Sequence, residues 1–404
     1  RTFEAFVQDD LVQYSLADLR RSLPSAIDGL KPSQRKVLHA CFERKLLPER
    51  QERKVTEVGG LCTEATAYHH GDASLHATII NMAQGFVGAN NVPLLDGVGQ
   101  FGSRAKGGKN AAAARYISTR LAPLTPLLFP TADAPVLSYR HEDGKRVEPY
   151  HFVPIVPLLL LNGASGIGTG WSTNVWGYHP LRVLDNVVAH AEGRTMEEME
   201  PWAKGFRGTL EMRRRAGRPS FVSRGIAEIV EGGVVVSELP LATWTESYKE
   251  WLIDKAEKGT AWWKSFSEGH TSQSVSFTLR TTKDQQNALL AKVAEGGPDV
   301  LTKLLDLETS HSLSNVHAFD ASGVLRHFAS PLELIEIHAD ARLSLYTKRI
   351  AHDLDAKAAD HALLDARARF VAMAVRGDLP ELFRRAPRRE VTDALKAAGF
   401  APRV

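Results

Sequence analysis

The stretch AAAARYISTR, residues 111–120, places Arg115 directly before Tyr116. A tyrosine hydroxyl has a pKa of about 10 and is a poor nucleophile until a cation or a metal stabilises the phenolate. A neighbouring guanidinium can do so, and it can also hold a phosphate through two hydrogen bonds. Because phenolate is a good leaving group, an aryl phosphate keeps its group-transfer potential. The pair therefore suits reversible cleavage of a phosphodiester, and an ordinary packing tyrosine is the alternative.

Two basic clusters stand out on a chain whose formal net charge is only +3. No acidic residue lies between Asp96 and Asp133, and the basic residues in this window are Arg104, Lys106, Lys109, Arg115 and Arg120. The second cluster, in which Trp202, Phe206 and Phe221 are interleaved and only Glu211 is acidic, consists of Lys204, Arg207, Arg213, Arg214, Arg215, Arg218 and Arg224. Local positive fields of this kind indicate a surface for a polyanion, and two of them favour nucleic acid over simple solvated faces.

The motif AYHHGD supplies a pair of histidines, His69 and His70. Paired histidines are more often structural than catalytic. Close to a basic, glycine-flanked loop, one of them could hydrogen-bond a phosphate or the tyrosine. The sequence leaves both interpretations open.

The glycine-rich run LLLLNGASGIGTGW imitates a dinucleotide-binding turn, since glycines follow an apolar segment. The context contradicts that interpretation, because Gly177 and Pro180 stand where the following helix should run. No acidic residue closes a second strand about twenty residues further on. The run therefore disfavours a nicotinamide enzyme and predicts a tight glycine turn that presents Ile167.

No metal site is expected within this chain. It has no paired CxxC and no HExxH, and its two cysteines make a disulfide framework unexpected and fit a reducing compartment. The one DxD, Asp353 and Asp355, has a spacing that sends the two carboxylates to different faces of a helix. No apolar run is long enough to span a membrane.

The pattern of the chain predicts an α+β protein of two to three domains, since 404 residues exceed a single core of usual size. Residues 1–123 are mostly helical, with one helix after Pro32 and a second in DASLHATIINMAQGF, followed by a flexible glycine-rich loop that carries basic residues. Residues 124–330 are interpreted as short strands, among them HFVPIVPLLLLN, a hairpin in GIAEIVEGGVVVSELP, and SVSFTLR. Residues 331–404 begin a long helix that projects outward or pairs as a coiled coil.

Taken together, these motifs closely resemble the DNA breakage-reunion region of type IIA DNA topoisomerases, in the eukaryotic topoisomerase II form that viruses also carry. The segments that carry the resemblance, in the order of that family, are DGLKPSQRKVL, AYHHGD, FVGANN, GQFGSRAKGGKNAAAARYI, VEPYHFVPIVPLLLLNGASGIGTGWST and ELPLATWTESYKE. The resemblance implies a winged-helix domain over 1–123, a tower domain over 124–330, and the start of a coiled coil over 331–404 that leads to an exit gate.

The resemblance also implies roles for single residues. Tyr116 matches the nucleophile that forms a 5′-phosphotyrosyl link, Arg115 its partner at the scissile phosphate, and His70 part of the active-site histidine motif. Ile167 matches a wedge that enters bent DNA. The remaining DNA-binding residues expected are Lys31, Arg35, Lys36, His69, Arg104, Lys106 and Lys109.

Several departures and missing parts accompany the resemblance. Asn110 stands where the family usually has aspartate, and Ser118 where an aromatic is common. We expect a fragment, because the chain begins at Arg1 and stops at Val404 before the returning helix of the coiled coil. The implied cofactors are Mg²⁺, held by a Toprim domain outside this chain, and ATP, held by an ATPase domain outside it.

The implied partners are double-stranded DNA, a second identical subunit, and the Toprim and ATPase regions of the same enzyme, with no membrane. The implied location is the nucleus, or a viral compartment if the protein is viral. A non-catalytic DNA-bending protein with the same basic surfaces is the alternative. A tyrosine recombinase would need its tyrosine near the C-terminus.

Overall fold

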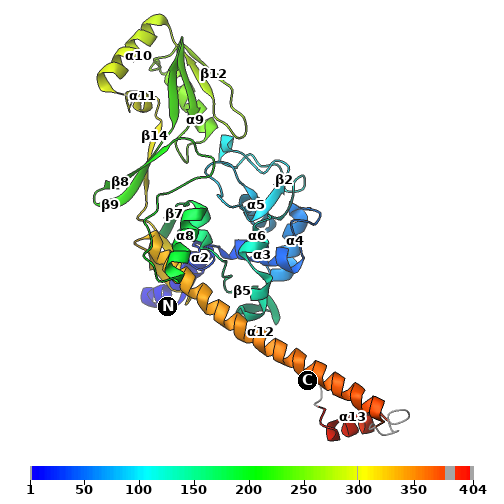
Figure 1. Ribbon diagram of the computed structural model, residues 1–404. Helices are drawn as coiled ribbons and strands as arrows, with labels where there is room; N and C mark the ends of the chain where they lie inside the picture. The colour runs from blue at the N-terminus through cyan, green and yellow to red at the C-terminus, as the bar shows by residue number, and fades with distance from the viewer. Residues whose placement is uncertain (1, 298, 378–386, 401–404) are drawn as a thin grey trace. The chain divides into compact units, whose positions relative to one another are not determined.

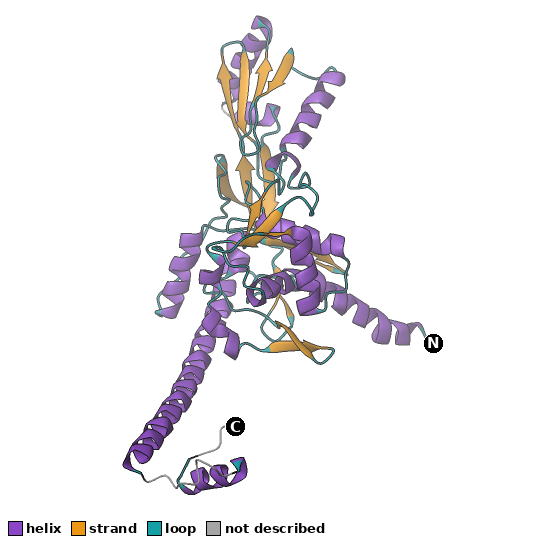
Figure 2. Ribbon diagram, turned by 90° about the vertical axis from the view of Figure 1, so that its right-hand side faces the viewer, coloured by secondary structure: helices purple, strands orange, loops and turns teal. Residues whose placement is uncertain are grey.

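The computed structural model describes residues 2–297, 299–377 and 387–400, and the chain divides into two compact units, residues 1–344 and 345–404. The first unit combines helices with antiparallel sheets, which confirms the α+β class (Figures 1 and 2). The helices are α1 (Phe3–Ala5), η1 (Phe6–Leu11), α2 (Val12–Ser22), α3 (Pro32–Glu43), α4 (Val55–Thr66), α5 (Asp72–Ala83), η2 (Arg104–Lys106), α6 (Thr125–Leu128), η3 (Thr131–Val136), α7 (Leu158–Asn162), α8 (Pro180–Ala191), α9 (Thr245–Glu257), α10 (Lys283–Gly296), α11 (Asp299–Leu304), α12 (Pro331–Arg376) and α13 (Arg388–Ala397).

Within the described residues, the strands form two three-stranded sheets, one four-stranded sheet and three two-stranded ribbons. The strand orders are β1-β3-β2, β10-β11-β13-β12, β14-β9-β8, β4-β5, β6-β7 and β15-β16. The strands are β1 (Arg53–Lys54), β2 (Leu95–Val98), β3 (Ser118–Leu121), β4 (Tyr139–Glu142), β5 (Lys145–Pro149), β6 (Ala164–Gly168), β7 (Trp171–Val175), β8 (Thr209–Arg215), β9 (Arg218–Arg224), β10 (Ile226–Val230), β11 (Gly233–Glu238), β12 (Ser265–Glu268), β13 (Phe277–Arg280), β14 (Glu308–Ser312), β15 (His317–Phe319) and β16 (Leu325–His327).

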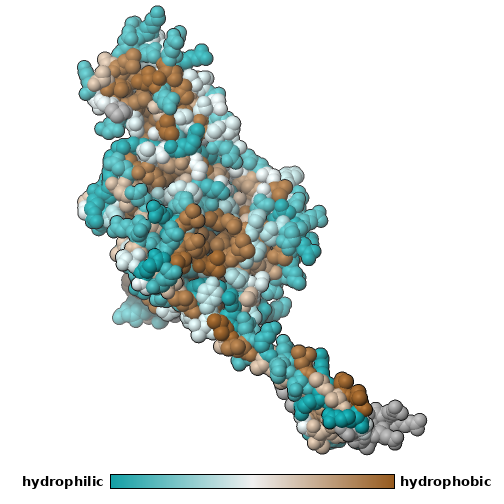
Figure 3. Space-filling view, in the orientation of Figure 1, coloured by the Kyte–Doolittle hydropathy of each residue, from teal (hydrophilic) through white to brown (hydrophobic). Residues whose placement is uncertain are grey.

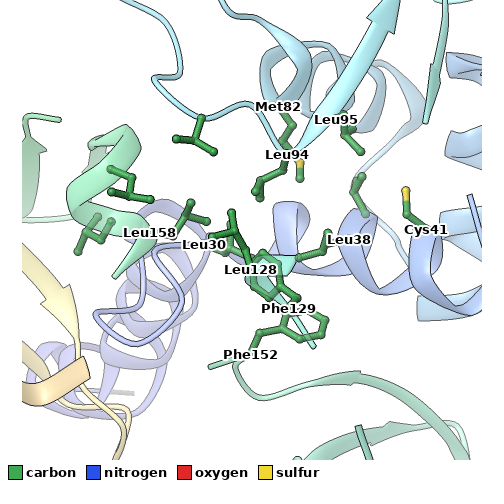
Figure 4. Packing of buried hydrophobic residues seen from close by; sticks show 14 of the residues in the cluster. Leu30, Leu38, Cys41, Met82, Leu94, Leu95, Leu128, Phe129, Phe152 and Leu158 are labelled. Carbon is green, nitrogen blue, oxygen red and sulfur yellow. The ribbon is translucent and has the colours of Figure 1, made fainter. Parts of the chain in front are cut away.

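The larger hydrophobic core lies around α3 and α5, both expected from their apolar periodicity. Pro32 occupies the first turn of α3, where its missing N–H costs no hydrogen bond. Figure 4 shows Leu38 and Cys41 of α3 in this core with Met82 of α5, Phe129 at the end of α6 and Phe152 after β5. Cys41 and Cys62 are both buried and free.

The smaller core packs helices against the four-stranded sheet (Figure 1). The inward side chains of β11 and β13, such as Val234 and Phe277, contact Tyr248 and Leu252 of α9. The predicted hairpin is confirmed as β10–β11, where Glu231 and Gly232 make the turn. The prediction of a strand in residues 274–280 is confirmed as β13.

The prediction of strand structure in HFVPIVPLLLLN is wrong, because its second half is helix α7. The run has no exposed side, because all four of its leucines are buried: Leu158, Leu159, Leu160 and Leu161. No alternation of apolar and polar residues therefore distinguishes a helix from a strand. A fully apolar run looks the same as strand or helix in sequence.

The two cores do not follow the boundaries expected for the domains. The larger core joins side chains from Ala26 to Ile335, and the smaller one lies between Val234 and Leu307. The division into winged helix (1–123), tower (124–330) and coiled-coil region (331–404) stays a prediction.

On the surface, α8 exposes Leu181, Leu184 and Val188, and Figure 3 shows an apolar area on the face where α8 lies in Figure 1.

The long helix expected after residue 331 is confirmed as α12, which has 46 residues and continues from the first unit into the second. Within the second unit, Phe400 follows α13 and packs its ring against Phe370, with ring centroids 6.1 Å apart. Arg369 lies over the same ring, 5.2 Å from its centroid.

Candidate nucleic-acid interface

The main chain at Tyr116 is fixed by hydrogen bonds, whereas the Tyr116 side chain is exposed to solvent. It lies two residues before β3, and its carbonyl oxygen accepts a hydrogen bond of 3.1 Å from the Lys54 Nζ. The next residue, Ile117, is buried, and its carbonyl accepts from the Val55 N–H at 3.0 Å. The Tyr116 side chain is 64% exposed. A fixed main chain with a free phenol is what a surface nucleophile requires.

Arg115 lies beside this phenol. Its guanidinium carbon is 4.9 Å from the centroid of the Tyr116 ring, so the cation covers the ring face. Arg115 is exposed as well, and its N–H groups can reach a phosphate that approaches the hydroxyl. The structure therefore brings together the two residues on which the sequence argument rests.

The two histidines lie at the surface between α4 and α5, and no hydrogen bond or ring contact in the described part of the chain joins them to Tyr116. The His69 Nε2 lies 3.0 Å from Glu142 Oε1, and this hydrogen bond holds the pKa of Glu142 below its usual value. The His70 ring stands perpendicular to the buried Tyr68 ring, 5.6 Å from it. His70 is thus exposed and oriented by packing.

Three basic residues predicted to contact phosphates lie in ion pairs within the protein, and a direct phosphate contact by them stays a prediction. Carboxylates inside the protein form ion pairs with the side chains of Arg35, Lys36 and Arg104. Arg35 bonds Asp28 through Nε at 2.7 Å and through Nη2 at 3.0 Å, with 7% and 0% of the two side chains exposed. Burial opposes the charge of Arg35, but Asp28 raises its pKa overall. A buried charge is tolerated only with such a partner.

Lys36 and Arg104 repeat this arrangement. The Lys36 Nζ lies 3.0 Å from Glu148, whose side chain is 1% exposed. Arg104 pairs with the buried Glu238, and its Nη2 also donates to the Leu239 carbonyl at 3.2 Å. Both carboxylates are far away in sequence from the basic residue that they pair with. The sequence around Lys36 and Arg104 therefore does not predict these ion pairs.

The glycine-rich loop that carries Arg104 is docked on its surroundings, which corrects the expectation of a flexible backbone. A side chain at Gly107 would collide with the Trp244 indole, and Gln84 donates to the Phe101 carbonyl at 2.8 Å. Asn110 accepts from the Ser103 N–H at 2.9 Å and donates to the Ser103 hydroxyl at 2.8 Å. An aspartate could keep the second contact only in the reverse direction, by accepting from the Ser103 hydroxyl, since an ionised carboxylate has no donor.

Two lysines of this loop remain outside the core. Lys106 is 52% exposed and lies 3.5 Å from Glu246, while Lys109 is exposed. These two are the basic residues of the loop that can meet a polyanion.

Ile167 lies on the β6–β7 hairpin and is 85% exposed, although it belongs to a strand. The glycines on either side of it serve the opposite face. A side chain at Gly166 would collide with the Ser22 carbonyl, and one at Gly168 would come within 2.9 Å of Leu19, both on α2. The hairpin therefore rests on α2 and projects Ile167 away from it.

Further hydrogen bonds tie this hairpin to its surroundings. Asp18 accepts from the Thr169 N–H at 2.9 Å, and Lys31 Nζ donates to the Ser165 carbonyl at 2.7 Å. Burial lowers the pKa of Lys31. Lys31 therefore supports the hairpin as well as facing a groove.

That groove, of about 450 Å³, runs along the hairpin and combines amides with indoles. Its polar and aromatic lining includes Lys31, Gln34, Asn81, Gln84, Asn90, Asn91, Asn162, Asn174, Trp176, Trp202 and Trp244. Several of these amides already bind the protein's own backbone: Gln84 donates to the Phe101 carbonyl, Asn91 to the Leu161 carbonyl and Asn162 to the Val92 carbonyl. These amides therefore shape the groove from inside. Sequence reasoning missed them, because they come from segments far apart.

A second hollow, of about 840 Å³, lies next to Ser118 and Lys54, close to Tyr116 in the chain. Its basic lining residues are Arg44, Lys45, Arg50, Arg53 and Lys54, against the acidic Glu52 and Glu57. Sequence reasoning missed this surface too. The basic run within residues 43–54 could have indicated it. With serine at 118, the hollow is not filled by the aromatic that the resemblance leads one to expect.

Among the described residues, no group of three or more histidine, cysteine or acidic side chains is arranged to hold a metal ion. No helix in the described ranges is long and apolar enough to cross a membrane.

Comparison with known proteins agrees with this geometry. The family model that describes the A subunit of DNA gyrase/topoisomerase IV matches residues 21–391. DNA topoisomerase 2 of Arabidopsis thaliana is 37% identical over 404 residues, which cover 99% of this chain and 27% of that protein. DNA topoisomerase 2 of Drosophila melanogaster is 39% identical over 340 residues, or 83% of this chain and 23% of that protein.

One solved structure, the DNA-binding, cleavage and re-ligation domain of Plasmodium falciparum topoisomerase II, superposes with a TM-score of 0.88 at 33% identity. The match covers 98% of this chain and 52% of that one. The chain thus spans about a quarter of the length of these two curated relatives. Its sequence and fold nevertheless match almost end to end, and the chain belongs to the DNA gyrase/topoisomerase IV family, as a type IIA DNA topoisomerase region of the eukaryotic form.

Proposed function

We propose that this chain is the DNA gate of a type II DNA topoisomerase, which binds and bends duplex DNA, breaks both strands transiently and reseals them after another duplex has passed. The observation that carries the proposal is the exposed Tyr116 with the Arg115 guanidinium 4.9 Å from its ring, on a fixed backbone. Its relatives are named DNA topoisomerase 2, and such an enzyme changes DNA topology.

The chemical step follows from the two side chains. The Tyr116 oxygen attacks the scissile phosphorus, the new O–P bond forms, and the bond from phosphorus to the 3′-oxygen breaks. The DNA keeps a 5′-phosphotyrosyl link, and the 3′-oxygen takes up a proton as the phenol loses one. Arg115 stabilises the negative charge on the phosphate oxygens. One phosphodiester replaces another, so the reverse attack by the 3′-hydroxyl can reseal the strand.

The surrounding residues take supporting roles in this proposal. His70 is free to hydrogen-bond the scissile phosphate, with His69 beside it toward the flanking backbone. Lys31, Lys106 and Lys109 supply phosphate contacts. Arg35, Lys36 and Arg104 act indirectly, because their ion pairs hold the loops on which the surface is built.

We assign Ile167 to the role of a wedge between base steps. Its exposure, 85%, combined with a hairpin anchored on α2, is the geometry such a side chain needs. Unstacking costs a few kcal/mol, which the contacts of bent DNA must offset. A homodimer would place two wedges symmetrically about the cleavage site.

The complete enzyme needs more than this chain in our proposal. Mg²⁺ would be held by an acidic Toprim domain outside this chain, and ATP by an ATPase domain also outside it. Two identical subunits form the gate, and the nucleus is the compartment suggested by eukaryotic relatives. At the gate itself, the metal would stabilise charge on the transferring phosphate.

Substitution of the nucleophile tests the proposal. In the full-length enzyme with Mg²⁺ and supercoiled DNA, Tyr116→Phe should abolish the covalent adduct trapped by denaturant, while the affinity for DNA persists. Tyr150→Phe is the matched control, because Tyr150 is 61% exposed and should leave adduct yield unchanged. Normal adduct yield in the Tyr116→Phe enzyme would place the nucleophile elsewhere. An unmodified enzyme that bends DNA without any adduct would support the non-catalytic alternative.

A further inference from the structure

The second basic cluster of the sequence divides into two parts on the sheet β14-β9-β8. At the base of the β8–β9 hairpin, arginines and glutamates alternate in a closed network. Arg213 lies 3.0 Å from Glu211 and 3.5 Å from Glu308, and Arg224 lies 2.8 Å from each of the same two carboxylates. These hydrogen bonds raise the pKa of both arginines and lower that of Glu211. Two positive and two negative charges cancel there.

The tip of the same hairpin is different. Ala216 and Gly217 form a two-residue turn with φ of 49° and 77°, so both central residues are left-handed and the turn resembles type I′. Arg215 and Arg218 are therefore the last cross-strand pair, directly opposite one another. Like charges in such a pair are destabilising. Within the described ranges, neither arginine has an acidic partner in an ion pair.

The register shows what surrounds this pair. Side chains alternate between the faces of a strand, so Glu211, Arg213 and Arg215 share the face that carries Arg218 and Ser220 on β9. Ser312 of β14 pairs with Ser220 and lies on the same face. The other face holds Phe221 and His311, which are buried. Both faces of β9 thus carry buried residues further along the strand, whereas Arg215 and Arg218, at the tip, are exposed.

A hollow of about 480 Å³ opens at this place. Besides the two arginines and the turn, hydroxyl groups line it, from Ser220, Ser310, Ser312 and Ser314. The Ser312 and Ser314 hydroxyls are 3.0 Å apart and either can donate to an anion. A fork of guanidinium donors beside hydroxyls suits phosphate oxygens.

We propose that this hairpin tip is a second phosphate-binding site, which holds the backbone of duplex DNA outside the segment that lies at Tyr116. The site is defined by Arg215, Arg218 and the serine-lined hollow. The proposal rests on the proposed function for the identity of its ligand. In Figure 1 the β8–β9 hairpin and strand β2, which pairs with the strand after Tyr116, lie on opposite sides of the first unit. Only a duplex that extends beyond the cleavage segment would reach the tip.

Two features of the tip suit a DNA backbone. The tip offers guanidinium and hydroxyl donors, which can bind phosphate groups whatever the base sequence of the DNA. A bound phosphate would also relieve the repulsion between Arg215 and Arg218. The hairpin would then steady the flanking duplex while the central segment is bent and cut.

Binding to duplexes of two lengths tests the proposal. Full-length protein that carries Tyr116→Phe, without Mg²⁺, is titrated at several salt concentrations with a duplex of about 20 base pairs and one of about 60, or about 70 and 200 Å long. Arg215→Ala and Arg218→Ala should each lower the log K against log salt slope by about 0.9 on the long duplex and leave the short one unchanged. The control is Arg214→Ala, on the opposite face of the same hairpin, which should change neither slope.

The outcomes separate clearly. An equal change of slope in Arg214→Ala would show that the hairpin attracts DNA only through its overall positive charge, and would overturn the site. Equal losses on both duplexes would overturn its position outside the cleavage segment, and unchanged slopes would overturn the contact itself. Competition by inorganic phosphate at millimolar concentration against the long duplex alone would instead assign the site to a free anion. Because cleavage is not measured, these results stand apart from the adduct test of Tyr116.

Discussion

Two parts of one acid-free window, residues 97–132, end up in opposite environments. The loop that carries Arg104 is docked, and the Arg104 side chain is 4% exposed against Glu238. The turn that carries Arg115 and Tyr116 is exposed, with the cation against its own neighbour's ring. In sequence both parts are equally basic. The difference teaches that a window without acids in the chain can still face an acid in space.

The cause is the cost of desolvation. A guanidinium that leaves water needs a partner that restores its hydrogen bonds, and in a fold this partner comes from any segment that packs there. Glu238, at the end of β11, and Asp28, before α3, provide this for Arg104 and Arg35. Arg115 stays in water and remains available to a ligand.

The largest expected effect comes from breaking the buried pair. Glu238→Gln removes the charge opposite Arg104, which leaves an uncompensated buried guanidinium, and should cost about 3–5 kcal/mol of the free energy of unfolding. Urea denaturation followed by circular dichroism measures it. The control is Glu246→Gln, whose carboxylate is 47% exposed opposite Lys106 and should change stability by no more than about 0.5 kcal/mol. Equal small changes in both variants would mean that Arg104 is solvated and not structural.

The same contrast holds for isoleucines. Ile79 is fully buried in α5, so Ile79→Ala should cost about 2–5 kcal/mol of stability. Ile167→Ala should leave thermal stability within about 0.5 kcal/mol, because the side chain is 85% exposed. Its effect should appear in DNA instead, as a smaller bend measured by fluorescence transfer between the ends of a bound duplex. A folded Ile167→Ala protein with the original bend angle would refute the wedge.

The parts that the sequence predicted are those decided locally. Helices α3 and α5 follow from apolar periodicity, the turn of β10–β11 from its glycine, and the Arg115–Tyr116 pair from adjacency. The length of α12 follows from a run without glycine or proline. Each needs no knowledge of what packs against it.

The parts that the sequence did not predict depend on distant segments. Helix α7 hides its period because every side chain of its leucine run is buried. The partners of Arg35, Lys36 and Arg104 come from other elements, as do the amides of the groove beside the hairpin. The glycines around Ile167 predict a tight turn that presents this side chain, but their close packing on α2 could not be foreseen from the sequence.

The smallest expected effect distinguishes two basic residues that remain near the surface of the same window. Lys109 is exposed, whereas Arg120 is 31% exposed, lies 3.3 Å from Asp96 and donates to the Arg50 carbonyl at 3.1 Å. A phosphate contact releases counterions only if the cation is not already neutralised by a carboxylate. Lys109→Ala should therefore lower the slope of log K against log salt by about 0.9, and Arg120→Ala should change it by much less. Titrations of a short duplex at four salt concentrations measure both slopes. Equal slopes for the two variants would show that pairing within the protein does not decide which cations meet DNA, and the contrast between the docked loop and the exposed turn would then lose its functional meaning.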